Sequence, residues 1–91
     1  MTDARLRKLR FRAWRRGFRE ADLILGGFAD RRLPGLTPAE LDQFEALLDQ
    51  PDPDLYAWIL GQACAPAPFD TELLASIRAF RLDPAALAHG A

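Results

Sequence analysis

Residue types that commonly carry chemistry are scarce in this 91-residue sequence, which contains one cysteine, Cys64, and one histidine, His89. A single cysteine excludes an internal disulfide, and one cysteine with one histidine is too few for a structural zinc site. A catalytic triad would have to use His89, which we expect in a frayed C-terminal tail. Glycine-rich phosphate loops are absent too. The sequence therefore predicts that the protein is not an enzyme and that Cys64 is an inert small hydrophobic residue.

Long apolar runs are also missing. The longest extend over only a few residues, as in LILGGFA, whereas a membrane-spanning helix needs about 20. Nothing near the N-terminus combines an apolar stretch with a small-residue cleavage site, and the arginine-rich start merges with the helical pattern that follows it. We expect a cytoplasmic protein without a membrane segment. A chain of 91 residues leaves room for one core and hence one domain.

Positive charge is abundant but lies mostly at one end of the chain. Residues 1–19 carry eight basic side chains and one acidic side chain, whereas residues 37–83 carry nine acidic and two basic ones. The formal net charge of −1 hides this asymmetry. Two explanations stay open at this point: a partner for the basic end, or ion pairs between the two halves of the chain.

Apolar residues recur at three- and four-residue spacing along the chain, and no segment alternates as a strand does. The pattern predicts an all-α fold, a compact bundle of about five short helices. We expect a single domain over residues 1–91, made of a basic N-terminal helix (4–16), a core region (17–82) and a short C-terminal tail (83–91).

Local signals mark where several of these helices begin and end. The sequence TPAE predicts a capping box with Thr37 as the N-cap. Asp52 and Asp70 are expected to cap the two helices that follow. Gly61 is expected to end the first of these two helices, because glycine tolerates the left-handed conformation common at helix C-termini.

Glycine also occurs inside helical stretches, where it lowers stability. Gly17 lies in a run of arginines, and a glycine in a helix interior costs about 1 kcal/mol relative to alanine. Either the chain turns at Gly17, or another group approaches the backbone closely there. For the same reason, the adjacent Gly26 and Gly27 indicate close packing against another helix or a partner.

Charged residues flank Gly17 at regular spacing. In a continuous helix Arg16 and Glu20 would form an ordinary pair worth roughly 0.2–0.5 kcal/mol, in the less favourable order. Alternatively, Gly17 admits a close approach while Arg16 and Glu20 present opposite charges beside it, and Asp22 suits the start of the next helix. The residues alone leave both interpretations open.

The segment from Arg15 to Gly61 resembles the family of the FAD assembly factor SdhE and its mitochondrial relative, succinate dehydrogenase assembly factor 2. The resemblance rests on the Arg-Gly-x-x-Glu motif at Arg16, Gly17 and Glu20, and on the downstream run LLDQPDPDLYAWILG. The sequence departs from the usual pattern of the family at Phe18, Ala21 and Gly27. The family more often has a methionine or leucine at the first of these positions, a leucine at the second and a basic residue at the third.

The resemblance implies a small helical protein that binds the flavoprotein subunit of succinate dehydrogenase and promotes covalent attachment of FAD to it. Fumarate reductase flavoproteins are further expected clients. FAD belongs to the partner in this picture, so we expect the chain itself to bind no cofactor and no metal. We expect a monomer whose partner-binding residues are Arg15, Arg16, Gly17, Arg19, Glu20 and Asp22.

The alternative is a non-enzymatic regulator of another class, an antitoxin-like or nucleic-acid-binding helical module that uses the basic first helix. Phe11 and Trp14, which lie among arginines, suit base stacking, and they fit equally well as core residues. A nucleic-acid-binding domain is expected to be strongly basic, however, and the isoelectric point is near 5.7. We therefore expect a protein partner and no nucleic acid.

Overall fold

The computed structural model describes residues 2–83, which form five α-helices and contain no β-strand. The helices are α1 (Thr2–Ala13), α2 (Arg19–Arg32), α3 (Pro38–Leu48), α4 (Asp52–Leu60) and α5 (Glu72–Arg81), and short 3₁₀ turns cover Leu33–Gly35 and Ala67–Phe69. The predicted all-α bundle is confirmed. Within residues 2–83, none of the helices combines the length and the apolar character that crossing a bilayer requires.

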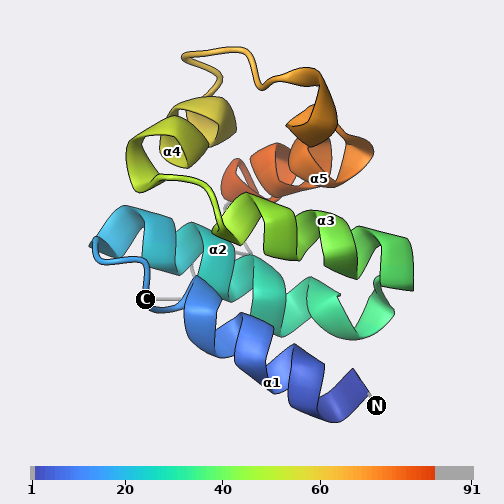
Figure 1. The fold of residues 1–91 in the computed structure, drawn as a ribbon. Helices are drawn as coiled ribbons and strands as arrows, with labels where there is room; N and C mark the ends of the chain where they lie inside the picture. Colours follow the sequence, from blue (N-terminus) through green and yellow to red (C-terminus); the bar gives the residue numbers. More distant parts are fainter. Residues whose placement is uncertain (1, 84–91) are drawn as a thin grey trace.

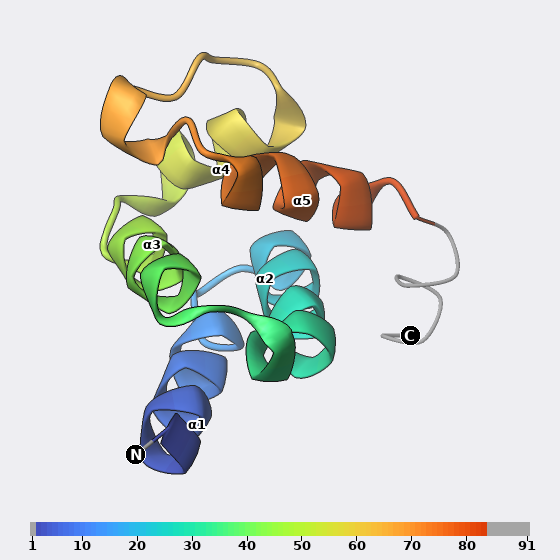
Figure 2. The ribbon, with the colours of Figure 1, turned by 90° about the vertical axis from the view of Figure 1, so that its right-hand side faces the viewer.

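The helices surround one apolar core. α2 contacts α1 on one side and α5 on the other, and α3 likewise contacts both α1 and α5 (Figures 1 and 2). Rings from three helices meet at the centre, where the Phe28 centroid lies 5.8 Å from that of Phe44 and 5.7 Å from that of Phe80. Every helix contributes buried side chains, among them Leu9, Leu25, Leu47, Ile59 and Ile77. The basic first helix is therefore part of the same core as the rest of the chain.

Three predicted boundaries are wrong. The first helix ends at Ala13 instead of residue 16, because the chain turns before Gly17. Asp52 is the first residue of α4, not its N-cap, and its carboxylate is used elsewhere in the fold. The N-cap of α5 is Thr71 instead of Asp70, and the Thr71 hydroxyl accepts a hydrogen bond from the backbone N–H of Leu74.

Two predicted helix ends are confirmed. Thr37 and Glu40 form the reciprocal capping box at the start of α3. Gly61 adopts the left-handed conformation, with φ of 77°, at the end of α4. The expected tail over residues 83–91 lies outside the described residues, except for Asp83.

The packing around α2 explains its paired glycines. The indole of Trp14 lies directly on the backbone of Gly26, where an added Cβ would be 2.2 Å from Trp14 Cδ2. The indole Nε1–H donates a hydrogen bond to Asp30 Oδ1 at 3.3 Å. On another side of the helix, a Cβ at Gly27 would lie 3.3 Å from the ring of Phe80. The close packing expected at both glycines is confirmed, and it fixes the position of Trp14.

We expect Gly26→Ala to lower the free energy of unfolding by about 1–3 kcal/mol, because overpacking against Trp14 outweighs the gain of about 1 kcal/mol in helix propensity. Gly35→Ala is the matched control, since nothing lies within 4 Å of the added Cβ, and we expect a change within about 0.5 kcal/mol. Urea unfolding followed by circular dichroism measures both. A Gly26→Ala variant as stable as the wild type would contradict the packing described here.

Candidate partner-binding site

The motif residues lie at the turn that joins α1 to α2. Gly17 adopts a φ of +111°, which side-chain-bearing residues rarely adopt. A Cβ added there would meet only Asp52 Oδ2, at 4.0 Å. Backbone conformation, not crowding by the chain itself, therefore requires glycine at this position. Of the two explanations open from the sequence, a turn at Gly17 is confirmed.

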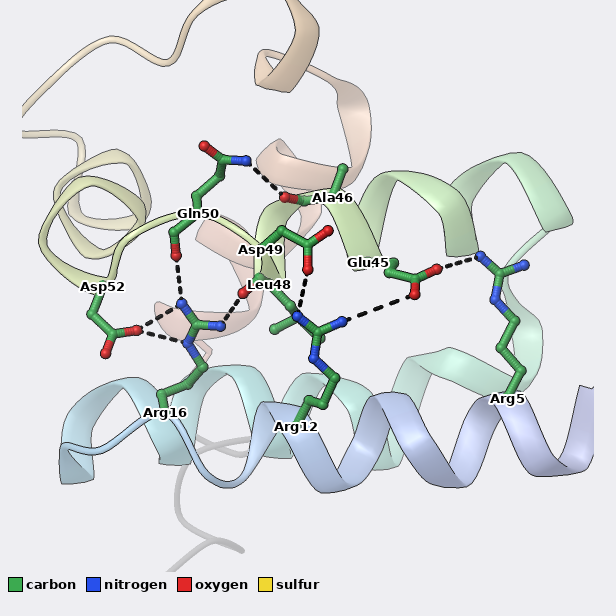
Figure 3. Close-up of polar contacts among 9 residues, drawn as sticks. All are labelled: Arg5, Arg12, Arg16, Glu45, Ala46, Leu48, Asp49, Gln50 and Asp52. Atoms are coloured by element: carbon green, nitrogen blue, oxygen red, sulfur yellow. Dashed lines mark hydrogen bonds and ion pairs between the residues drawn. The ribbon is translucent and has the colours of Figure 1, made fainter.

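Arg16 points from this turn toward the junction of α3 and α4 (Figure 3). Its Nε and Nη2 lie 2.8 and 2.6 Å from Asp52 Oδ1. Its Nη2 also donates to the carbonyl oxygen of Gln50 at 2.7 Å, and Nη1 donates to that of Leu48. The Arg16 side chain is 10% exposed and that of Asp52 33%. Arg16 thus connects the end of α3 to the start of α4, where a cation is favoured by the unpaired carbonyls of the preceding helix.

Asp22 fixes the turn from its other side. It lies in the first turn of α2, and its Oδ1 accepts a hydrogen bond of 2.7 Å from the backbone N–H of Arg16. The turn is therefore held at Arg16 by two contacts, since the backbone of this residue is bound to α2 and its side chain to the α3–α4 junction. These two predicted site residues are therefore occupied with contacts inside the fold.

Two more arginines of α1 face the acidic side chains of α3. Arg5 Nη2 lies 2.6 Å from Asp42 Oδ1 and 3.1 Å from Glu45 Oε1. Arg12 Nη2 lies 2.5 Å from Asp49 Oδ1, and Arg12 Nη1 lies 3.9 Å from Glu45 Oε2. Figure 3 shows Glu45 between the two arginines and Asp49 beside Arg12. The hydrogen bond to Asp42 raises the pKa of Arg5 above its ordinary value. Internal pairing of the two halves of the chain, one of the two explanations left open, is confirmed for these residues and for Arg16.

The remaining predicted site residues face solvent. Arg15, Gly17, Arg19 and Glu20 are all exposed. Within residues 2–83, the side chains of Arg19 and Glu20 make no hydrogen bond or ion pair. The guanidinium of Arg15 lies 4.4 Å from the centroid of the Phe11 ring. The fold therefore separates the predicted set into residues with internal contacts and residues available to a partner.

A solvent-open groove of about 680 Å³ runs beside the turn. Its lining includes four residues of the predicted set, Arg15, Gly17, Arg19 and Asp22, but not Glu20. The remaining lining residues were not predicted from the sequence and are apolar: Trp14, Phe18 and Leu23.

For two of these apolar residues, the sequence suggested roles other than lining a groove. Trp14 was considered for base stacking or for the core, and it is a half-buried groove residue held by Gly26. Phe18 was noted only as a departure from the family pattern. Its ring contacts Tyr56 edge-on, with centroids 4.9 Å apart. The aromatic walls of the groove are thus anchored on α2 and α4.

Sites for other chemistry are not visible in the part of the chain that the structure describes. Residues 2–83 contain no group of three or more histidine, cysteine, aspartate or glutamate side chains arranged to hold a metal ion. Cys64 is exposed in the loop between α4 and α5.

Comparison with known proteins identifies the family of the chain. Residues 7–81 match the family model described as "Flavinator of succinate dehydrogenase". The chain belongs to this family. The matched region of the flavinator family includes the α1–α2 turn, the groove and all five helices apart from the first residues of α1. The family expected from the Arg-Gly-x-x-Glu motif is thereby confirmed.

Several relatives of the flavinator family are similar over most of the chain. The mitochondrial succinate dehydrogenase assembly factor 2 of Dictyostelium discoideum is 44% identical over 68 residues, which cover 75% of this chain and 48% of that protein. The FAD assembly factor SdhE of Acetobacter pasteurianus is 39% identical over 71 residues, which cover 78% of this chain and 65% of that protein. The FAD assembly factor SdhE of Coxiella burnetii is 46% identical over 55 residues, which cover 60% of this chain and 66% of that protein. The chain thus spans about half to two thirds of the length of these relatives.

We expect Arg16→Ala to lower the free energy of unfolding by about 2–3 kcal/mol, because it leaves the partly buried Asp52 carboxylate and two carbonyl oxygens without their donor. Arg16→Lys is expected to recover only part of this loss, since one ammonium cannot reproduce the geometry of the guanidinium. Arg19→Ala, an exposed arginine of the same motif, is the control and should change stability by less than about 0.5 kcal/mol. Equal stability of the Arg16→Ala and Arg19→Ala variants in urea unfolding would contradict an anchoring role for Arg16.

Proposed function

We propose that this chain binds the flavoprotein subunit of succinate dehydrogenase and promotes covalent attachment of FAD to it. The observation that carries the proposal is the match of residues 7–81 to the flavinator family. The exposed turn adds support, because it places motif residues beside a groove where a partner has access to them. Flavoproteins of fumarate reductase are proposed as further clients.

The proposed role is that of an assembly factor and not of a catalyst. Attachment of FAD requires a client side chain and the flavin to meet in a reactive geometry, and correct orientation alone lowers a barrier by several kcal/mol. A bound protein favours such a geometry only to the extent that it binds that conformation of the client more tightly than the others. A rigid binding surface meets this requirement, and the anchored α1–α2 turn provides one.

Glu20 is the motif residue for which a direct contact with the client is most strongly supported. It is exposed in the first turn of α2 and has no partner within residues 2–83. A client group that binds it displaces no internal contact. Arg16 and Asp22 differ, because their polar atoms already bind within the fold; we propose that they act on the client by holding the turn.

Nucleic-acid binding, the alternative considered from the sequence, is not supported by the family match. The structure also weakens the electrostatic argument for nucleic-acid binding. Arg5, Arg12 and Arg16 form ion pairs with carboxylates of α3 and α4, so part of the basic charge of the N-terminal region is neutralised within the chain.

The finer details remain proposals. We propose that the chain acts as a monomer, that FAD is held by the client, and that the chain needs no cofactor of its own. A cytoplasmic location stays a prediction, since the relatives comprise bacterial proteins and proteins named as mitochondrial.

The proposal is tested by producing the cognate flavoprotein subunit with and without this chain and measuring protein-bound flavin fluorescence on a denaturing gel. We expect fluorescence to require the chain. Glu20→Gln should lower the rate of attachment at least about tenfold, equal to about 1.4 kcal/mol of lost interaction, because a charge-assisted contact is removed.

Glu72→Gln is the matched control, because Glu72 is also an exposed glutamate in the first turn of a helix. Its attachment rate and the unfolding midpoints of both variants should equal those of the wild type. Equal flavin attachment with and without the chain would reject the proposed function. Unfolding of the Glu20→Gln variant would instead assign Glu20 a structural role.

A further inference from the structure

Five of the eight basic side chains in residues 1–19 fall into two sets in the fold. Arg5, Arg12 and Arg16 face α3 and α4 and are neutralised there. Arg15 and Arg19 are exposed at the groove, and neither has a carboxylate partner within residues 2–83. The charge of Arg15 and Arg19 is therefore available to a separate molecule.

The groove between these two arginines has apolar walls. Trp14, Phe18 and Leu23 line it. Close by, Phe11 is 59% exposed, and the guanidinium of Arg15 lies over its ring. Cations next to exposed aromatic surface favour an occupant that is both acidic and apolar.

The walls are also held in place before any partner binds. Trp14 is fixed by the backbone of Gly26 and by its hydrogen bond to Asp30. Phe18 is supported by the ring of Tyr56. A pre-formed groove loses little side-chain entropy on binding, which favours a specific contact.

We propose that this groove receives an acidic segment of the flavoprotein client, with an apolar side chain placed between Trp14 and Phe18 and carboxylates placed beside Arg15 and Arg19. The inference rests on the proposed function and adds to it the chemistry of the client segment. A protein segment fits better than a nucleic acid, because the formal net charge of the chain is −1, whereas a domain that binds a phosphate backbone is expected to be strongly basic. Recognition by the groove is then distinct from the contact made by Glu20.

Hydroxyl-radical footprinting with mass spectrometry tests occupancy of the groove on the unmodified chain. The chain is exposed to radicals alone and in complex with the purified flavoprotein subunit. We expect oxidation of Trp14 to fall several-fold in the complex. Cys64, which is exposed in the loop at the end of the molecule away from α1 (Figure 1), serves as the reference and should keep its rate. An unchanged Trp14 rate in a formed complex would overturn the inference.

Paired substitutions test the charge of the segment. We expect Arg15→Gln with Arg19→Gln to raise the Kd for the flavoprotein about tenfold at low salt and to weaken its dependence on ionic strength. Arg31→Gln with Arg32→Gln is the matched control, because both arginines are exposed on α2 and Arg32 lies over Phe28 as Arg15 lies over Phe11. The control Kd should stay within about twofold of the wild-type value.

The outcomes separate the inference from the proposed function. If the wild-type chain supports flavin attachment but the Arg15/Arg19 and Arg31/Arg32 double variants bind the client with equal Kd, the groove proposal is wrong and the proposed function stands. If no complex forms and no flavin is attached, both fail. Protection of Trp14 by a single-stranded oligonucleotide, without protection by the flavoprotein, would assign the groove to nucleic acid and overturn the inference.

Discussion

The guanidinium of Arg16 joins segments of the chain that are distant in sequence, and the position of the α1–α2 turn depends on it. One side chain binds the Asp52 carboxylate and the carbonyl oxygens of Leu48 and Gln50, at the point where α3 ends and α4 begins. The backbone N–H of the same residue binds Asp22 of α2. Each of these groups would otherwise be a partly buried polar atom without a partner, which is unfavourable. The contact therefore links α2, α3 and α4 through a single residue outside all helices.

This arrangement gives the residues of the Arg-Gly-x-x-Glu motif different roles. Arg16 anchors the turn, and Gly17 supplies a backbone conformation that the turn requires. Glu20 is left exposed on the first turn of α2. In the proposed function, a rigid scaffold of this kind presents a charged contact and an aromatic groove in fixed positions, which allows binding energy to favour one conformation of the client.

The sequence predicted those features of the fold that depend on neighbouring residues. The capping box of Thr37 and the left-handed Gly61 are set within one helical turn and were recognised correctly. Asp52 resembles an N-cap by the same local rule, but its carboxylate binds an arginine 36 residues away, and no local pattern reports such a contact. Asp70 and Thr71 are adjacent and both suit an N-cap by the local rule, and in the structure Thr71 is the N-cap.

The candidate site was predicted in part for the same reason. Its charged residues stand together in the motif, so the sequence alone proposes Arg15, Arg19 and Glu20 as partner-binding residues, and the structure shows that they are exposed. The groove was not found, because its walls depend on the direction of the turn and on the packing of Trp14 against Gly26. The glycine pair did indicate close packing, but its partner could be identified only in three dimensions.

The coupling free energy between Arg16 and Asp52 tests the central claim of this account most directly. It is obtained from the unfolding free energies of the wild type, Arg16→Gln, Asp52→Asn and the double variant. If Arg16 anchors the turn through Asp52, the double variant should lose about 1–3 kcal/mol less unfolding free energy than the sum of the two single losses. Losses that add within about 0.3 kcal/mol would mean that the two side chains are independent, which would contradict an anchoring role for the Arg16–Asp52 ion pair.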